Sequence, residues 1–222
     1  MVMGELVYVD LGRRPYDEGL DLQRRLVERA ITHRDSPESL ILVEHDPPVI
    51  TLGRAAKEGN VVMTPEQLEA MGFQVRRVER GGDVTYHGPG QIVAYPILRL
   101  DDRGRDVHAY LRNLEEVILR VLGRLGVVGE RIEGLTGVWA ATGKVAAVGV
   151  AVKRWVTYHG FSLNVCPDMS HYRAIVPCGL DKPVTSVSEL LGRKVETSQV
   201  KPLVVECMRD VFGFERAVEG TR

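Results

Sequence analysis

Cysteine is scarce in this sequence, and several other features that would define a protein class are missing. The 222 residues contain three cysteines, Cys166, Cys178 and Cys207, with no CxxC pair and no zinc-finger spacing of cysteine and histidine. These absences argue against a disulfide scaffold and a structural zinc site, and an odd count fits a reducing compartment. The sequence also lacks an apolar run of about 18 residues and a basic start followed by an apolar segment. We therefore expect a soluble cytoplasmic protein without a membrane span, a signal peptide or a metal.

An excess of charge of either sign is absent as well. The chain has 29 Lys and Arg residues against 30 Asp and Glu residues, and its formal net charge is -1. A dedicated nucleic-acid-binding protein usually carries a basic excess, so this balance argues against nucleic-acid partners. Apolar residues make up 44% of the chain, which is typical of a globular protein with a sizeable core. No repeat or low-complexity linker divides the sequence, and we expect a single domain over residues 1–222.

Strand-like and helix-like segments alternate along the chain. Periodic apolar residues predict helices over residues 16–33, 106–125 and 198–212, and a Thr64 cap followed by Pro65 predicts a short helix ending near Gly72. Runs rich in Val and Leu predict strands over residues 6–11, 39–44, 49–52, 73–78, 91–98, 138–141, 144–152 and 155–165. The spacing around residue 143 predicts a hairpin with antiparallel pairing. The pattern favours an α+β (mixed α/β) fold over a strict βαβ repeat.

The most unusual segment is the glycine-rich run RGGDVTYHGPGQ, from Arg80 to Gln91. Its four glycines and one proline predict a tight loop with exposed backbone, to which Arg80 and His87 add polar groups. The plain alternative is a structural hairpin with a turn. Because strands usually tolerate only isolated glycines, we interpret Gly81 and Gly82 as a bulge or part of a binding loop.

A second segment, from Gly143 to Val150, begins with Gly-Lys but is not a phosphate-binding loop. The pattern GxxxxGK[ST] needs a glycine where Val138 stands and a serine or threonine where Val145 stands. Lys144, at the start of a strand, is most simply a solvated edge residue. The alternative is that the Ala and Val residues after it face inward and line an apolar groove.

Cys178 has the setting of a nucleophile. It lies between Pro177 and Gly179, at a turn where backbone amides are available to an oxyanion. A nearby cation is needed to lower the pKa of such a thiol, and the candidates are Lys144, His87, His159 and His171. A Cys–His pair would suggest a thiol hydrolase, whereas a Cys–Lys pair would suit acyl transfer to an amine. The spacing does not choose between them.

Taken together, these segments resemble the lipoyl(octanoyl) transferase family. The family pattern RGGxxTxHxPGQ matches residues 80–91, GK(I/V)A(A/S)(I/L/V)G matches 143–149, HG(F/L)(A/S)LN matches 159–164 and PCG matches 177–179. Four motifs in the right order are far more specific than any one of them. One position departs from the usual family sequence, because Asp83 stands after Arg-Gly-Gly where the family often has Gln.

The resemblance implies a mixed sheet flanked by helices, as in lipoate and biotin protein ligases, and an enzyme that needs no cofactor. Family members move an octanoyl group from octanoyl acyl carrier protein to a lysine of lipoyl domains, in the E2 subunits of 2-oxoacid dehydrogenases and in the glycine cleavage H protein. Cys178 would be the nucleophile and Lys144 its acid/base partner, with His159 in a supporting role. The residues implied to line the substrate groove are Arg80, Gly81, Gly82, Asp83, Val84, Thr85, Tyr86, His87, Ala147, Val148, Gly149, Gly160, Phe161 and Ser162.

Three alternatives stay open on the sequence alone. An ATP-dependent lipoate or biotin ligase of the same fold would not need a nucleophilic cysteine. A thiol hydrolase would use His87 or His159 as its base and release free octanoate. A non-catalytic module would bind an acyl carrier or lipoyl domain without using Cys178.

A basic patch near the mouth of the site is a further expectation, because acyl carrier proteins are acidic. The candidates are Arg76, Arg77, Arg80, Lys153 and Arg154, whose plain alternative is ordinary solvated surface.

Overall fold

A mixed β-sheet forms the centre of the protein. The computed structural model describes residues 3–141, 143–176 and 183–221. The strands of the sheet within these ranges are β1 Met3–Arg14, β2 Glu38–His45, β6 Gln91–Ile97, β7 Gly129–Glu130, β8 Val138–Ala140, β9 Gly143–Lys153, β10 Val156–Asn164 and β11 Phe214–Glu219. Their order is β11-β1-β2-β6-β10-β9-β8-β7. β1 is parallel to β2 and β11, and the other neighbours are antiparallel.

A second, smaller sheet packs beside the first. It consists of β3 Val49–Leu52, β4 Gln74–Arg77 and β5 Val84–His87, with β3 parallel to β4 and antiparallel to β5. The short helix α2 Pro65–Ala70 covers it, and Leu68 of α2 packs with Ile50 and Phe73 in a separate hydrophobic cluster. α2 begins with the predicted capping box at Thr64, because the Thr64 side chain accepts a hydrogen bond from the Gln67 amide.

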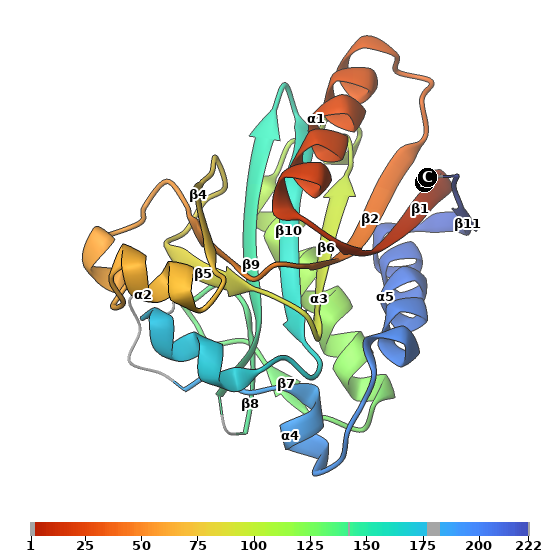
Figure 1. Ribbon diagram of the computed structural model, residues 1–222. Helices are drawn as coiled ribbons and strands as arrows, with labels where there is room; N and C mark the ends of the chain where they lie inside the picture. Colours follow the sequence, from red (N-terminus) through yellow and green to blue (C-terminus); the bar gives the residue numbers. More distant parts are fainter. Residues whose placement is uncertain (1–2, 142, 177–182, 222) are drawn as a thin grey trace.

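Helices cover both faces of the large sheet, as Figure 1 shows: α1 Tyr16–Thr32 lies on one face, and α3 Val107–Arg124 and α5 Thr197–Phe212 lie on the other. Val27 and Ala30 of α1 pack against Ile97 and Val156. α3 and α5 supply the largest hydrophobic cluster together with the opposite face of the sheet. A further short helix is α4 Val187–Leu191, and three 3-10 turns are η1 Glu58–Asn60, η2 Asp101–Arg103 and η3 Met169–Ala174. None of the helices in the described ranges is long and apolar enough to cross a membrane.

The sequence of α3 explains both its position and its beginning. Leu114, Ile118 and Val121 recur at helical spacing and are fully buried against the sheet. The Asp106 side chain accepts a hydrogen bond of 2.9 Å from the Ala109 amide and caps the helix as predicted. One residue on the same helix breaks the amphipathic pattern, because Glu115 is completely buried.

The antiparallel pairing of β9 with β10 brings the motif at residues 143–149 beside the motif at residues 159–164. The register pairs Ala147 with Ser162 and Gly149 with Gly160. Gly160 allows a close approach of β6, because a Cβ atom at this position would lie 2.2 Å from the Ala94 carbonyl oxygen. The two strands therefore form one continuous wall.

The mixed α/β fold class and the hairpin partner strands β8 and β9 confirm the sequence predictions. One prediction is wrong: residues 84–87, expected within a backbone-exposed loop, form the buried strand β5. The neighbouring glycines favoured a loop, but antiparallel pairing with β3, which is distant in sequence, gives residues 84–87 the hydrogen bonds of a strand. The short strand β7, the terminal strand β11 and α4 were also not predicted.

Candidate active site

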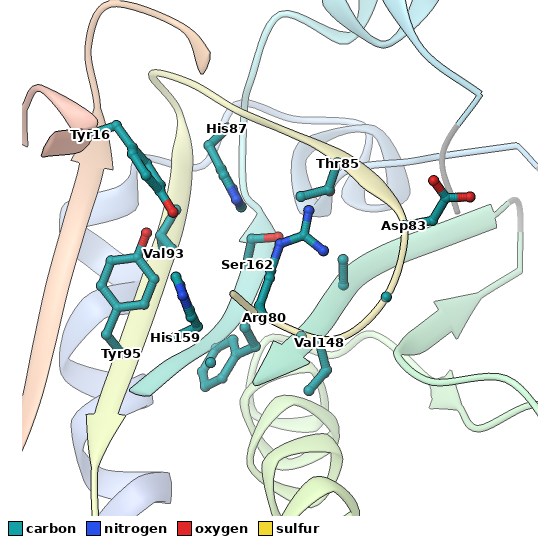
Figure 2. Close-up of a pocket in the computed structure, with 15 residues that line it drawn as sticks. Tyr16, Arg80, Asp83, Thr85, His87, Val93, Tyr95, Val148, His159 and Ser162 are labelled. Carbon is teal, nitrogen blue, oxygen red and sulfur yellow. The ribbon is translucent and has the colours of Figure 1, made fainter. Parts of the chain in front are cut away.

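A pocket lies where the small sheet meets the large sheet (Figure 2). The space between its walls, open solvent included, is about 470 Å³. Its lining residues come from α1, from the segment that leads into β5, and from β5, β6, β9 and β10. They are Tyr16, Arg80, Gly82, Asp83, Thr85, His87, Val93, Tyr95, Ala147, Val148, Gly149, His159, Gly160, Phe161 and Ser162.

Arg80 lies in the middle of this pocket and not on the surface (Figure 2). Its side chain is 7% exposed, and one guanidinium nitrogen donates to the carbonyl oxygen and the hydroxyl of Thr51 at 2.7 and 2.8 Å. A second nitrogen donates to the Gly81 carbonyl at 3.0 Å. The expectation that Arg80 belongs to a surface docking patch is therefore wrong, because backbone and hydroxyl acceptors hold its charge inside the protein.

His87 is held in one tautomer by Gln91. Its Nδ1 lies 2.7 Å from Gln91 Oε1, while the Gln91 amide nitrogen donates to Asn164 Oδ1 at 2.9 Å. Because an amide oxygen only accepts hydrogen bonds, His87 Nδ1 carries the proton and Nε2 is left as an acceptor. Burial lowers the pKa of His87 well below its usual value. His87 is therefore neutral at pH 7.

Two more buried histidines lie close to this end of the pocket. His159 lines the pocket with a backbone φ of 55°, and its amide donates to the Gln23 side chain at 2.8 Å. His45 lies next to Tyr95, and its Nε2 forms a 2.7 Å hydrogen bond with the Tyr95 hydroxyl. Burial lowers the pKa of each imidazole to about 4, and the Arg80 charge adds to the effect on His159.

These histidines make stability depend on pH in the acidic range. The unfolded chain takes up protons on His45 and His159 below about pH 6.5, whereas the folded chain resists protonation until about pH 4. We therefore expect the free energy of unfolding to be fully retained above pH 6.5 and to fall by about 3 kcal/mol per histidine by pH 4. Urea unfolding at pH 7, 5.5 and 4.5 measures the effect.

Replacing one buried histidine and one exposed histidine separates this effect from the titration of carboxylates. We expect His45→Gln to flatten the pH dependence, while His108→Gln, at an exposed position on α3, controls for the substitution itself. Equal pH slopes in the wild type and in His45→Gln would contradict the assignment.

Lys144 is buried at the start of β9, with 7% of its surface exposed. Its ammonium lies 5.0 Å from the centre of the Trp139 ring, and its backbone pairs with the strand-like segment at Val184 through bonds to Pro183 and Thr185. The interpretation as a solvated edge residue is therefore wrong.

A small cavity beside Lys144 adjoins the main pocket. Its lining residues are Thr85, Lys144, Ala146, Ala147, Asn164, Tyr172 and Val184. Thr85 and Ala147 also line the main pocket. The structure thus supports the alternative in which β9 faces inward, because the cavity beside Lys144 and the main pocket share two lining residues.

Cys178 lies outside the described residues, as do Pro177 and Gly179. The described chain on one side ends at Val176, whose amide donates to the Asn60 carbonyl at 2.7 Å. On the other side, Pro183 accepts a hydrogen bond of 2.9 Å from the Lys144 amide. The described residues thus attach one flank of this segment to Lys144.

Asp83, the residue that departs from the usual family sequence, has a structural explanation here. One carboxylate oxygen accepts from the amides of Lys57 and Val84 at 3.1 and 2.8 Å. The other accepts from the Asn60 side chain at 2.5 Å. Because Asn60 also binds the Val176 amide, Asp83 ties the edge of the pocket to the chain that precedes residue 177.

The structure places most of the expected groove residues on the pocket, and three elsewhere. Gly81, Val84 and Tyr86 are not among the lining residues. The Tyr86 hydroxyl instead lies 2.9 Å from Nδ1 of His171, one of the candidate cations, which does not line the pocket.

Sequence reasoning missed three lining residues, Tyr16, Val93 and Tyr95. Val93 and Tyr95 alternate along β6, so the period of a strand carried a signal for them. Tyr16 at the start of α1 had none. Among the described residues, no group of three or more His, Cys, Asp or Glu is arranged to hold a metal ion.

The arrangement of the two sheets defines the class of protein first. The bi-partite lipoate protein ligase of Thermoplasma acidophilum superimposes with a TM-score of 0.73, at 16% sequence identity, over 100% of this chain and 89% of that chain. The fold is therefore that of the lipoate protein ligase catalytic domain.

Closer relatives then identify the family. The model described as "Lipoyl protein ligase A/B catalytic domain" matches residues 15–209. An octanoyltransferase of Gloeobacter violaceus is 48% identical over 96% of this chain and 93% of its own length, and one of Syntrophotalea carbinolica is 48% identical over 88% and 89%. The chain belongs to the octanoyltransferase family and is an acyltransferase.

Proposed function

We propose that the chain, as one catalytic domain, transfers an octanoyl group from octanoyl acyl carrier protein to a lysine of a lipoyl domain, through a thioester on Cys178. The observation that carries the proposal is the buried Lys144, whose small cavity adjoins the main pocket at Thr85 and Ala147. An amine next to a substrate pocket suits acyl transfer between a thiol and an amine.

In the first step, the Cys178 thiolate attacks the carbonyl carbon of the octanoyl thioester. A new C–S bond forms to Cys178, and the C–S bond to the carrier breaks. The Lys144 ammonium stabilises the thiolate beforehand and gives its proton to the departing carrier thiol. One thioester replaces another, so the exchange is nearly balanced in energy and needs no ATP.

In the second step, the lysine amine of the lipoyl domain attacks the octanoyl group on Cys178. A C–N bond forms, the C–S bond breaks, and Cys178 leaves as thiolate. Neutral Lys144 takes the proton that the amine loses, which restores the starting ion pair. An amide is more stable than a thioester, and this difference drives the reaction forward.

The pocket has the composition that an eight-carbon acyl chain requires. The side chains of Val93, Val148 and Phe161 form its apolar surface. Burial lowers the pKa of both His87 and His159, which makes each imidazole a weak proton acceptor. We therefore assign them to holding the walls in place and not to primary base catalysis. Arg80 is the positive charge among the lining residues and faces the polar end of the substrate in this proposal.

The carrier protein approaches a surface that is less basic than the sequence suggested. Arg76 forms an ion pair of 2.9 Å with Asp17, and Lys153 pairs with Glu28. Arg77 and Arg154 are exposed. We propose the exposed Arg154 as a contact to an acidic carrier. The acceptors in this proposal are lipoyl domains of 2-oxoacid dehydrogenase E2 subunits and the glycine cleavage H protein.

The mass of the intact protein tests the proposed function. After mixing with octanoyl acyl carrier protein in the absence of ATP, we expect a gain of one octanoyl group, which then moves to an added lipoyl domain. No adduct, under conditions in which ATP and free octanoate do modify the lipoyl domain, would favour a ligase instead. Release of free octanoate without an acceptor would favour a hydrolase.

A further inference from the structure

The Lys144 side chain rests directly on the α-carbon of Gly137. A Cβ atom at position 137 would lie 2.6 Å from Lys144 Cε and 3.2 Å from Nζ. It would also lie 2.7 Å from the Ala146 carbonyl oxygen, and φ of Gly137 is 131°, a conformation that favours glycine. The space that another side chain would occupy is therefore filled by the Lys144 chain.

The backbone of Gly137 is fixed by the buried carboxylate of α3. Glu115 Oε1 accepts a 2.9 Å hydrogen bond from the Gly137 amide. Its other oxygen, Oε2, accepts from Arg112 at 2.6 Å and lies 3.3 Å from Nε of Arg131. Both carboxylate oxygens are thus engaged, as a fully buried charge requires. The contact joins α3 to the residue on which Lys144 lies.

Trp139 holds the other side of the Lys144 ammonium. Trp139 is the cross-strand partner of Lys144, and the register shifts between Val138 and Trp139. The ammonium lies 5.0 Å from the centre of the indole ring, within the range of a cation–π contact. A lysine side chain has four flexible methylene groups, and here the glycine and the indole limit where its amine can go.

We propose that Glu115 and Gly137 are positioning residues for Lys144. Glu115 fixes the Gly137 backbone, and Gly137 supplies the bare surface that directs the Lys144 amine toward the cavity it shares with Thr85 and Ala147. The inference rests on the catalytic role proposed for Lys144. In this proposal both residues act through Lys144.

Gly137→Ala tests the contact from the side of the glycine. The added methyl displaces the Lys144 amine, and a displacement of about 1 Å at a reacting group can reduce turnover about 100-fold. We expect such a loss in the rate of octanoyl transfer, with little change in the KM for octanoyl acyl carrier protein. In the Lys144→Ala background most of this loss should disappear, and the part that remains measures the clash of the methyl with the Ala146 carbonyl oxygen.

Glu115→Leu tests the positioning of Lys144 without adding an atom that clashes at Gly137. We expect a loss of at least about tenfold in the transfer rate, again absent in the Lys144→Ala background. The matched control is Glu116→Leu, the neighbouring carboxylate on α3, which is partly exposed and pairs with Arg120 and Arg131. This control should transfer octanoyl groups at the wild-type rate.

Tryptophan fluorescence reports the position of the lysine independently of activity. The chain has two tryptophans, so Trp155→Phe leaves Trp139 as the single emitter. We expect Gly137→Ala and Lys144→Ala each to change the Trp139 emission, and the double variant to match Lys144→Ala. Circular dichroism and thermal unfolding establish that each variant is folded.

Two results would overturn the inference and leave the proposed function intact. One is a wild-type transfer rate in both folded variants, Gly137→Ala and Glu115→Leu, while Lys144→Ala is inactive. The other is a loss that multiplies with that of Lys144→Ala, as independent structural damage does. Full activity of Lys144→Ala would instead refute the role of Lys144 in the proposed function.

Discussion

Replacing Cys178 by serine is expected to abolish the octanoyl adduct and to lower transfer to a lipoyl domain by at least about 10³-fold. A thiol becomes a nucleophile by losing its proton, which a nearby ammonium favours. A serine hydroxyl at pH 7 keeps its proton unless a strong general base removes it. Lys144 as ammonium is a proton donor and does not supply such a base. The measurement is the mass of the intact protein after mixing with octanoyl acyl carrier protein.

The other two cysteines provide matched controls for this prediction. Burial raises the pKa of the Cys166 thiol and of the Cys207 thiol, so both remain protonated at pH 7. Cys207 is buried on α5 within the main core, and Cys166 follows β10. We expect Cys166→Ser and Cys207→Ser to keep the adduct. An adduct that survives in Cys178→Ser and disappears in Cys166→Ser would show that Cys166 is the nucleophile and that the assignment to Cys178 is wrong.

Local sequence signals predicted the helices and the central strands well. Asp106 and Thr64 were predicted as helix caps, and both cap a helix through a hydrogen bond to the backbone. These signals depend on residues close in sequence, which is why they could be read without the structure. The same holds for β8 and β9, which are close together in the sequence and pair antiparallel.

The elements that were missed depend on contacts between distant residues. β5 follows two glycines, and only its pairing with β3 reveals it as a strand. β11 is rich in charged residues and becomes a strand by parallel pairing with β1, at the opposite end of the chain. Propensity is a weak guide in both cases because tertiary contacts decide the outcome.

In the candidate site, too, some features could be predicted from the sequence and others depend on contacts between distant residues. The resemblance supplied the residues of β9 and β10, and the antiparallel register explains why Ala147 and Ser162 meet. It did not supply the surroundings of Lys144. Trp139 is a near neighbour in sequence, but Glu115 lies on α3, and nothing in the sequence pattern relates that helix to the lysine. A buried glutamate in an amphipathic helix was the available signal, since such a charge needs partners.

Replacing Lys144 by alanine is expected to lower octanoyl transfer by about 10²- to 10⁴-fold, the range typical of a general acid–base residue. Alanine removes the cation that stabilises the Cys178 thiolate. It also removes the group that gives a proton to the leaving carrier thiol and takes one from the attacking amine of the lipoyl domain. Formation of the adduct and its transfer should therefore both slow down. Rapid-quench measurement of the adduct, followed by addition of a lipoyl domain, separates the two steps.

Lys144→Arg distinguishes these two roles of the lysine. Arginine keeps the positive charge but does not give up its proton in proteins, and its planar head is larger than the ammonium that fits between Gly137 and Trp139. We expect Lys144→Arg to form the adduct faster than Lys144→Ala and to remain slow in transfer, because the neutral base for the second step is missing. If Lys144→Arg restored both steps, charge alone would account for the role of Lys144, and its assignment as the acid/base partner would be wrong.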